Sequence, residues 1–188
     1  MRKNYFSNTL KMLLTIVFSC VFMSVWAQSE IHVEKAGTLP SLLPTSENTL
    51  KITGSINGTD VKHLRKLISE GSVNSLDLSG VRIVKGGSAY DGTNKTEDDI
   101  IGPTMFKNFT NLRSVELPAT ITAIRSQAFA ATGLKKVDIP NTVSTLEDHV
   151  FADCSFLNTV VIGRRVSRMH QGVFYNSPVK TAFVKPET

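Results

Sequence analysis

The stretch Leu134–Cys154, LKKVDIPNTVSTLEDHVFADC, carries the pattern that the C-terminal half of the chain repeats. Its phenylalanine belongs to a series spaced by 23, 22 and 23 residues: Phe106, Phe129, Phe151 and Phe174. Aliphatic residues recur at fixed distances on both sides of each phenylalanine, so that six columns agree across three or four units. A period of this size is typical of solenoids, in which each unit stacks on the next.

Each unit is expected to contribute one strand and one return segment. The spacing L-x-x-V-x-L places Leu112, Val115 and Leu117 on the inner side of an extended segment, while Ser114 and Glu116 point outward. The return segment holds apolar residues five positions apart, which predicts turns or short helical pieces. Because one unit cannot bury its own apolar face, neighbouring units form the core together. The pattern therefore predicts an α/β, β-rich solenoid with a parallel strand ladder.

The N-terminal half is expected to begin the solenoid. Residues 73–78 repeat the strand spacing, but about 17 residues more than one period separate them from the next unit. That excess falls in residues 85–99, KGGSAYDGTNKTEDD, which should form a long solvated loop. Upstream, residues 49–56 alternate like a strand. Thr59 or Asp60 can cap a helix that runs to about Ser69 and ends at Gly71.

These patterns divide the chain into regions. We expect a signal peptide over residues 1–27, an N-terminal cap over 28–72, repeats over 73–184 and a tail over 185–188. Within the repeats, the divergent unit carries the 85–99 insertion, and further units lie near residues 101–122, 124–145, 146–168 and 169–184. The cap strand and helix would cover the otherwise open core of the first repeat.

The first 27 residues have the features of an export signal. Basic residues precede an apolar run from Met12 to Trp26, and small residues favour cleavage after Ala27. The run is shorter than the roughly 20 residues that span a bilayer. Two alternatives are a retained signal anchor and lipid attachment at Cys20, whose preceding residues loosely resemble a lipobox. We expect a secreted or outer-surface protein, with membrane contact only under those alternatives.

The charge of the chain depends on this signal. The whole sequence holds 21 Lys and Arg against 16 Asp and Glu, a net charge of +5. Removing three basic residues with the signal leaves 18 against 16, a net charge of +2. Such a balance gives no reason to expect nucleic acid as a partner. Cleavage also removes Cys20, which leaves Cys154 without an internal disulfide partner.

The repeats resemble the BspA-like, Treponema-type leucine-rich repeat of bacterial surface proteins, whose unit reads roughly L-x-x-I-x-L-P-x-x-V-x-x-I-x-x-x-A-F-x-x-C. Residues 134–154 follow it closely, and LRSVELPATITAIRSQAFAAT, residues 112–132, differs at the cysteine position. The last unit differs more, with Gly163 in place of proline and Ser177 in place of cysteine. The segment LKITGSINGTDVKHLRKL, residues 50–67, resembles the N-terminal segment of secreted members. The resemblance implies a leucine-rich repeat fold outside the cell, where some members bind host matrix proteins or other bacteria.

The sequence contains no catalytic motif: it has no nucleophile elbow, no P-loop and no HExxH. His149 and His170 fall in different columns of consecutive units, which argues against a shared metal. Cys154 stands in a column of small residues and is expected to pack in the core. We therefore expect no enzyme activity, no cofactor and no metal site.

Two charged segments also call for an explanation. Residues 91–99 hold four acidic side chains but lack the D-x-D-x-D-G spacing of a calcium loop, which favours a solvated insertion. Arg164, Arg165 and Arg168 lie in one return segment without interleaved aromatic residues. They are expected to form a solvated surface instead of a specific polyanion site.

The outward strand positions provide the candidate ligand-binding residues. One column changes from acidic to apolar toward the C-terminus, and its neighbour is polar. The candidates are Asp77, Glu116, Lys136, Asp138, Val161 and Phe183. A contact with the tail, or simple tolerance of exposed apolar groups, would equally explain Phe183. About five strands spaced about 4.8 Å apart give a face of only about 300–400 Å², so this face alone should bind weakly.

Together these features predict a non-catalytic recognition module that is secreted or held at the cell surface. Its partner would be an extracellular protein or glycan, with adhesion as one such role. The alternative is a truncated or degenerate repeat protein that self-associates through an uncapped C-terminal edge.

Overall fold

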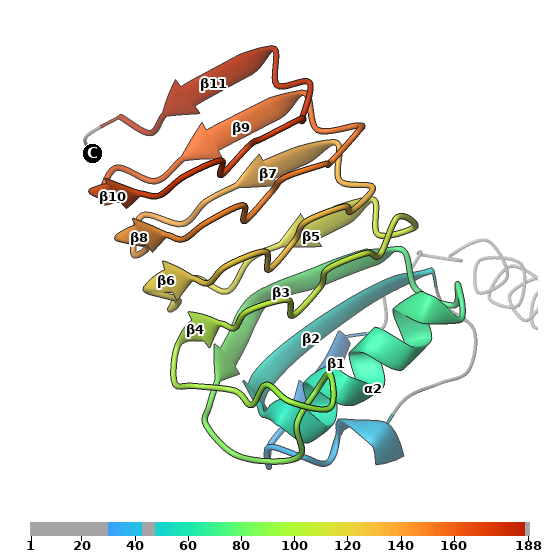
Figure 1. The fold of residues 1–188 in the computed structure, drawn as a ribbon. Helices are drawn as coiled ribbons and strands as arrows, with labels where there is room; N and C mark the ends of the chain where they lie inside the picture. Colours follow the sequence, from blue (N-terminus) through green and yellow to red (C-terminus); the bar gives the residue numbers. More distant parts are fainter. Residues whose placement is uncertain (1–29, 43–47, 187–188) are drawn as a thin grey trace, which may run out of the picture.

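A ladder of parallel strands runs along one side of the molecule (Figure 1). The computed structural model describes residues 30–42 and 48–186. The ladder strands, in order along the stack, are β1 (Glu30–Val33), β2 (Thr49–Ile56), β3 (Ser75–Ile83), β5 (Ser114–Glu116), β7 (Lys136–Asp138), β9 (Thr159–Ile162) and β11 (Thr181–Val184). Every paired neighbour is parallel, which confirms the predicted solenoid with its strand ladder.

The ladder is interrupted once. It consists of a four-stranded part, β1-β2-β3-β5, and a three-stranded part, β7-β9-β11. β5 and β7 lie side by side in the stack but are not paired (Figure 1). The two parts are therefore joined at this point by the other layers of the solenoid.

A second, narrower ladder runs through the return segments. It consists of two-residue strands, β4 (Ile100–Ile101), β6 (Ala123–Ile124), β8 (Thr145–Leu146) and β10 (Arg168–Met169). They pair in parallel in the order β4-β6-β8-β10, across the level at which β5 and β7 are unpaired. The predicted turns are present in the return segments, but from residue 100 to residue 180 these segments contain no short helix.

The backbone of the turns explains why no helix forms there. Each return segment places two residues about four positions apart in the left-handed region: Thr104 and Asn108, Gln127 and Ala131, and His149 and Asp153, with φ between 54° and 67°. A left-handed residue interrupts an α-helix. The intervening N–H groups instead donate to the next row, as Phe129 N does to Val150 O at 2.9 Å and Phe151 N to Val173 O at 2.8 Å. The turns thus form a third line of row-to-row hydrogen bonds.

The core lies between these layers and is built from the repeat columns. The phenylalanine rings stack along it with centroids 5.3 Å apart from Phe106 to Phe129, 5.3 Å from Phe129 to Phe151 and 5.7 Å from Phe151 to Phe174. The inward strand positions of the middle rows are buried, as their spacing predicts: Leu112, Val115, Leu117, Leu134, Val137, Ile139, Leu157 and Val160. The period therefore specifies the core directly.

The first rows are built around α2 (Gly58–Ser69), which connects β2 to β3. The helix takes the place of a return segment: Arg65 Nη1 donates to Thr104 O at 3.0 Å, and Asn111 Nδ2 donates to Ile68 O. A short 3-10 helix, η1 (Leu39–Ser41), also packs on α2 and buries Leu39. The strand and helix of the cap lie where the sequence places them.

The residue that caps α2 differs from the prediction. The N-cap is Asn57, whose side chain accepts from Thr59 N at 2.9 Å. Asp60 lies three residues further on and reaches back to Asn57 N at 2.9 Å, which completes a capping box. At the other end, Gly71 follows the helix with φ of 79°, a conformation that favours glycine. The predicted stop is confirmed and the predicted N-cap is wrong by two or three residues.

The 85–99 insertion is less solvated than predicted. Tyr90 is only 2% exposed, and its hydroxyl donates to Pro103 O at 2.8 Å. Thr96 is also buried and donates to Val84 O at 2.8 Å. The loop therefore packs on the rows that it connects, because Tyr90 and Thr96 are buried there and donate hydrogen bonds to backbone carbonyl groups.

The predicted signal peptide, its cleavage after Ala27 and the alternative lipid attachment at Cys20 lie outside the described residues. In residues 30–42 and 48–186, no helix is long and apolar enough to cross a membrane.

Candidate functional site

The outer face of the strand ladder holds most of the candidate residues in one line. Strand register places Asp77 beside Glu116, Asp138 beside Val161, and Val161 beside Phe183. Lys136 is brought to the neighbouring column, where it lies beside Thr159. We call this surface the ladder face: the outward side chains of β3, β5, β7, β9 and β11. The acidic residues Asp77 and Glu116 lie on one side of the β5–β7 interruption. The apolar residues Val161 and Phe183 lie on the other side, together with Asp138.

The acidic side chains of the ladder face differ in their surroundings. The Asp77 carboxylate accepts from Ser79 N at 2.9 Å and from Ser79 Oγ at 2.6 Å, so it stabilises the bend in β3. Glu116 is exposed, and the described residues provide no hydrogen bond or ion pair to its carboxylate. Glu116 is therefore the acidic group that remains available to a ligand.

Asp138 is paired with the tail. Lys185 follows β11, its N–H donates to Ile162 O at 2.9 Å, and its ammonium group forms an ion pair with Asp138 across β9. The sequence left open whether the tail covers Phe183. The tail does make a crossing contact, but Lys185 pairs with Asp138, and Phe183 remains 57% exposed.

A groove of about 380 Å³ opens at the carboxyl ends of β5 and β7, where the ladder is interrupted. Glu116, Asp138 and Lys185 contribute its charges, and Asn141 and Thr142 contribute further polar groups. The groove joins the ladder face to the adjoining turns. It offers one carboxylate that has no partner among the described residues, one ion pair and an amide, which suits a polar ligand with both donors and acceptors.

The apolar end of the ladder face is formed by Val161 and Phe183. In the last row, Met169 is 48% exposed, whereas Leu146, one row earlier in the same column, is buried. Val184 is 66% exposed, whereas Ile162, one row earlier in its column, is partly buried. This exposed edge continues from the ladder face to the end of the described stack.

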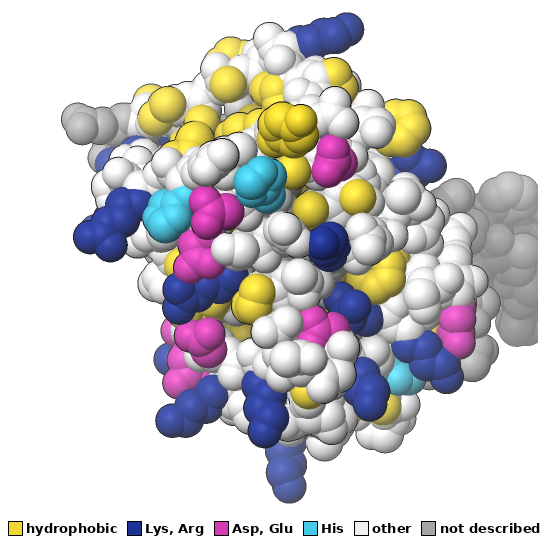
Figure 2. All heavy atoms as spheres, viewed as in Figure 1, with side chains coloured by type: hydrophobic (Ala, Val, Ile, Leu, Met, Phe, Trp, Pro, Cys, Tyr) yellow, Lys and Arg dark blue, Asp and Glu magenta, His cyan; other side chains and the backbone are white. Residues whose placement is uncertain are grey.

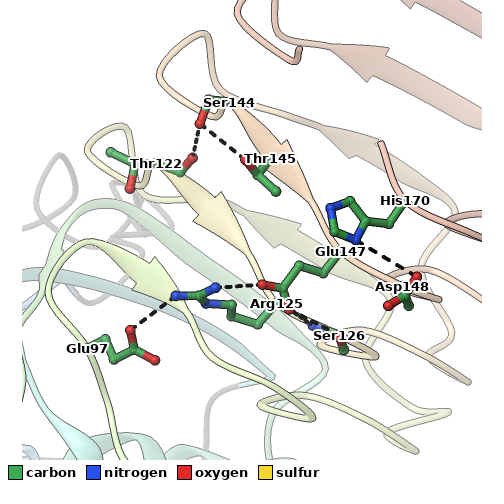
Figure 3. A network of polar contacts seen from close by, with 9 residues as sticks. All are labelled: Glu97, Thr122, Arg125, Ser126, Ser144, Thr145, Glu147, Asp148 and His170. Atoms are coloured by element: carbon green, nitrogen blue, oxygen red, sulfur yellow. Dashed lines mark hydrogen bonds and ion pairs between the residues drawn. The ribbon is translucent and has the colours of Figure 1, made fainter. Parts of the chain in front are cut away.

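A network of polar contacts that the sequence did not indicate links three levels of the return segments (Figure 3). Arg125 Nη1 lies 2.6 Å from Glu147 Oε1, and Arg125 Nη2 lies 3.2 Å from Glu97 Oε2. Glu147 also accepts from Ser126 N and Ser126 Oγ, each at 3.0 Å. Burial opposes ionisation of Glu147, but these hydrogen bonds outweigh it and lower its pKa below the ordinary 4.5.

This shift predicts an acid-sensitive contribution to stability. A depressed folded-state pKa stabilises the protein above the ordinary pKa and ceases to do so as the pH falls through the folded-state value. We expect Glu147→Gln to lower the free energy of unfolding by about 1 kcal/mol at pH 7. Below about pH 4.5 the difference between the two proteins should shrink, in urea titrations at several pH values. Glu116→Gln is the matched control; a difference for Glu147→Gln that stays constant down to pH 3 contradicts the assignment.

The side chains of His149, His170 and Cys154 each contact another side chain of the protein. His149 contacts the Tyr175 ring edge-on, with centroids 6.1 Å apart, and His170 Nδ1 lies 4.0 Å from Asp148 Oδ1. Cys154 is a free, buried thiol 3.2 Å from Thr132 Oγ1, and burial raises its pKa. Among the described side chains, no three His, Cys, Asp or Glu residues are grouped so that they could hold a metal ion.

Three acidic side chains of the 91–99 loop, those of Asp91, Asp98 and Asp99, bind donors of the loop and of the segments beside it. The Asp91 carboxylate accepts from Thr104 Oγ1 at 2.6 Å and from Asn94 N at 2.7 Å. Burial raises the pKa of Asp91, but these bonds and others within the loop outweigh it and keep the pKa well below its usual range. Asp98 accepts from Lys85 N, and Asp99 pairs with Arg82 at 3.4 Å. Each of these carboxylates is engaged by a donor of the protein.

Comparison with known families and structures identifies one family model. The model described as BspA type Leucine rich repeat region matches residues 94–188, with six copies. Among solved structures, a leucine-rich repeat protein from Bacteroides ovatus is 19% identical, with a TM-score of 0.45, over 81% of this chain and 39% of that one. A leucine rich cell surface protein from Faecalibacterium prausnitzii is 15% identical, with a TM-score of 0.29, over 74% of this chain and 55% of that one.

No curated protein matches the chain. The match to each of the two solved structures covers less than two thirds of that protein's length.

Proposed function

Because the chain belongs to the BspA-type leucine-rich repeat family, we propose that it is a non-catalytic recognition module that acts outside the cell or at its surface. The observation that carries this proposal is the ladder face, where Glu116 has no hydrogen bond or ion pair within the described residues and Phe183 is exposed. The N-terminal export pattern supports the location, and the absence of a catalytic motif from the sequence supports a binding role.

The ligand is an extracellular protein or glycan. The groove beside Glu116 and the Asp138–Lys185 pair would accept polar groups, and Phe183 would supply the aromatic contact that dominates many interfaces. Because the ladder face is small, a single copy should bind weakly, with a dissociation constant in about the micromolar range. Attachment of several copies to one cell surface would raise the overall avidity.

The test compares ladder-face variants with matched controls. Phe183→Ser should weaken binding by about 30-fold and Glu116→Lys by about fivefold or more, against purified matrix glycoproteins and a glycan array. The controls are Phe156→Ser, which removes an aromatic ring that is 51% exposed elsewhere, and Glu34→Lys on the cap. Binding that survives both ladder-face changes rules out the ladder face as the recognition surface.

The exposed last row favours a second function, self-association through that edge. Within the described residues, the outer edges of β10 and β11 are unpaired. Apolar side chains of Met169 and Val184 are exposed beside these edges, as they would be if a neighbouring row were missing. Arg164, Arg165 and Arg168 lie exposed between the end of β9 and the start of β10, at the same end of the stack, and would oppose contact between copies at low salt. Light scattering should then show association that increases with protein and salt concentration and is abolished by Val184→Lys. A monomer under all these conditions excludes this function.

A further inference from the structure

A groove of about 650 Å³ lies on the cap, away from the ladder face. We call it the cap groove. Its lining includes Thr59, Lys62, Arg65, Lys66 and Ser69 from α2, and Phe109 from the return segment that packs beside the helix. Figure 2 shows Lys and Arg side chains gathered over this lower part of the molecule. The volume is within the usual range of ligand sites, about 300–1,000 Å³.

The cations of the cap groove project from one face of α2. Lys62, Arg65 and Lys66 are related by i, i+3 and i+4 spacing, so their charges lie close together and repel one another. Among its described lining residues none is acidic. Glu70 lies 3.7 Å from Lys66, but both side chains are more than half exposed, so this pair compensates little of the charge. An anion bound in the groove would relieve the repulsion.

Arg65 is fixed in place before any ligand arrives. Its guanidinium carbon lies 5.0 Å from the Phe109 ring centroid and 6.0 Å from that of Tyr90, while Nη1 donates to Thr104 O and Met105 O. Neither carbonyl neutralises its charge, and the nearby Asp91 carboxylate, which accepts from Thr104 and Asn94, compensates it only in part. A preorganised guanidinium loses little conformational entropy on binding an anion and matches sulfate or carboxylate groups.

The walls of the groove favour a glycan over a peptide. Arg65 already covers Phe109, so the groove lacks a free aromatic pocket for an apolar anchor side chain. The groove is formed along a helix instead of a free strand edge, so it cannot hold a peptide by strand pairing. What it presents is a row of cations with hydroxyl groups of Thr59 and Ser69 beside them. Such a row suits a chain that carries an anionic group on successive units.

We propose that the cap groove binds an anionic polysaccharide, one that bears sulfate or carboxylate groups in series. Lys62 and Lys66 contact two successive anionic groups, about 6 Å apart along the helix axis, and the guanidinium of Arg65 adds a fixed positive charge beside them. This site uses neither the ladder face nor its ligand, so it adds a second binding surface to the protein.

The experiment measures binding of a heparin hexasaccharide by isothermal titration calorimetry at fixed ionic strength. Lys62→Gln/Lys66→Gln should weaken binding by about tenfold or more, because two ionic contacts are lost. The matched control, Arg164→Gln/Arg165→Gln, removes the same charge from the exposed segment between β9 and β10 and should change affinity less than twofold. Gln and Lys have similar helix propensities, and circular dichroism checks that α2 persists. If the double variant loses helical signal, Lys66→Gln alone is compared with Arg165→Gln.

Three results would overturn the proposal. Equal losses in both double variants would mean that the protein attracts polyanions only through its net charge. Poly-glutamate of equal charge that binds as tightly as the hexasaccharide would make the cap groove a site for acidic peptides. Failure of the unmodified protein to bind both the heparin hexasaccharide and a polygalacturonate oligomer would leave the groove without a glycan ligand.

Discussion

Phe129→Ala is expected to lower the free energy of unfolding by about 3–5 kcal/mol. The Phe129 ring is fully buried and lies in the middle of the stack, 5.3 Å from the rings on both sides. Its removal leaves a cavity bounded by Phe106 and Phe151, which the backbone hydrogen bonds of the turns prevent from closing. Because small domains are stable by only about 5–15 kcal/mol, this loss is a large fraction of the total.

Urea denaturation followed by circular dichroism would measure this effect. The matched control is Phe174→Ala, which removes the same side chain from the last, partly buried position of the stack. We expect a loss of about 1–2 kcal/mol there, because the cavity is open to solvent. Equal losses at both positions would contradict the larger cost assigned to the enclosed cavity at Phe129.

Asp60→Ala is expected to cost about 3 kcal/mol or more. The Asp60 carboxylate is completely buried and accepts three backbone N–H groups: Gly37 at 2.6 Å, Leu39 at 2.9 Å and Asn57 at 2.9 Å. Alanine would leave these donors without partners. It would also detach the segment that precedes η1 from the start of α2, so the whole cap should loosen.

Thermal unfolding and amide hydrogen exchange can separate the local and global parts of this effect. Asp98→Ala is the matched control, because the Asp98 carboxylate accepts one backbone N–H in an exposed loop. That change should cost less than about 1 kcal/mol. Asp60→Asn should lie between the two, because the amide keeps one acceptor oxygen while an NH2 group, which cannot accept a hydrogen bond, replaces the other. An Asp60→Ala loss no larger than that of Asp98→Ala would contradict the assigned role.

The periodic residues allowed the ladder and the core to be predicted. A residue such as Val137 is buried for the same reason as Val115 and Val160, so one row predicts the next. The same logic placed β2 and the end of α2 at Gly71, since alternation and a left-handed glycine are local signals. The candidate column of the ladder face aligned for the same reason, although the column alone says nothing about what binds to it.

Features set by contacts between distant segments could not be predicted. The sequence offers Asp60 as a candidate N-cap, but it lies three residues inside the helix, and its bonds to Gly37 and Leu39 depend on how the chain before the helix folds back. The burial of Tyr90 depends on Pro103 and on the neighbouring helix. The left-handed turns are formed by residues such as Gln127 and Ala131, which have no strong preference for that conformation. The cap groove likewise required knowledge of which face of α2 stays uncovered.

The unpaired junction between β5 and β7 has a mechanical consequence. Row-to-row hydrogen bonds run along the axis of the stack, so tension between the cap and the last row stretches the rows apart in series. At this junction the β6–β8 pair and the turns resist the tension on one side only, whereas the side of Glu116 and Asp138 has no strand pairing. A pull along the axis would bend the stack about β6–β8 and widen the groove. Under the proposed function, such tension would therefore change the shape of the surface that we propose as the binding surface.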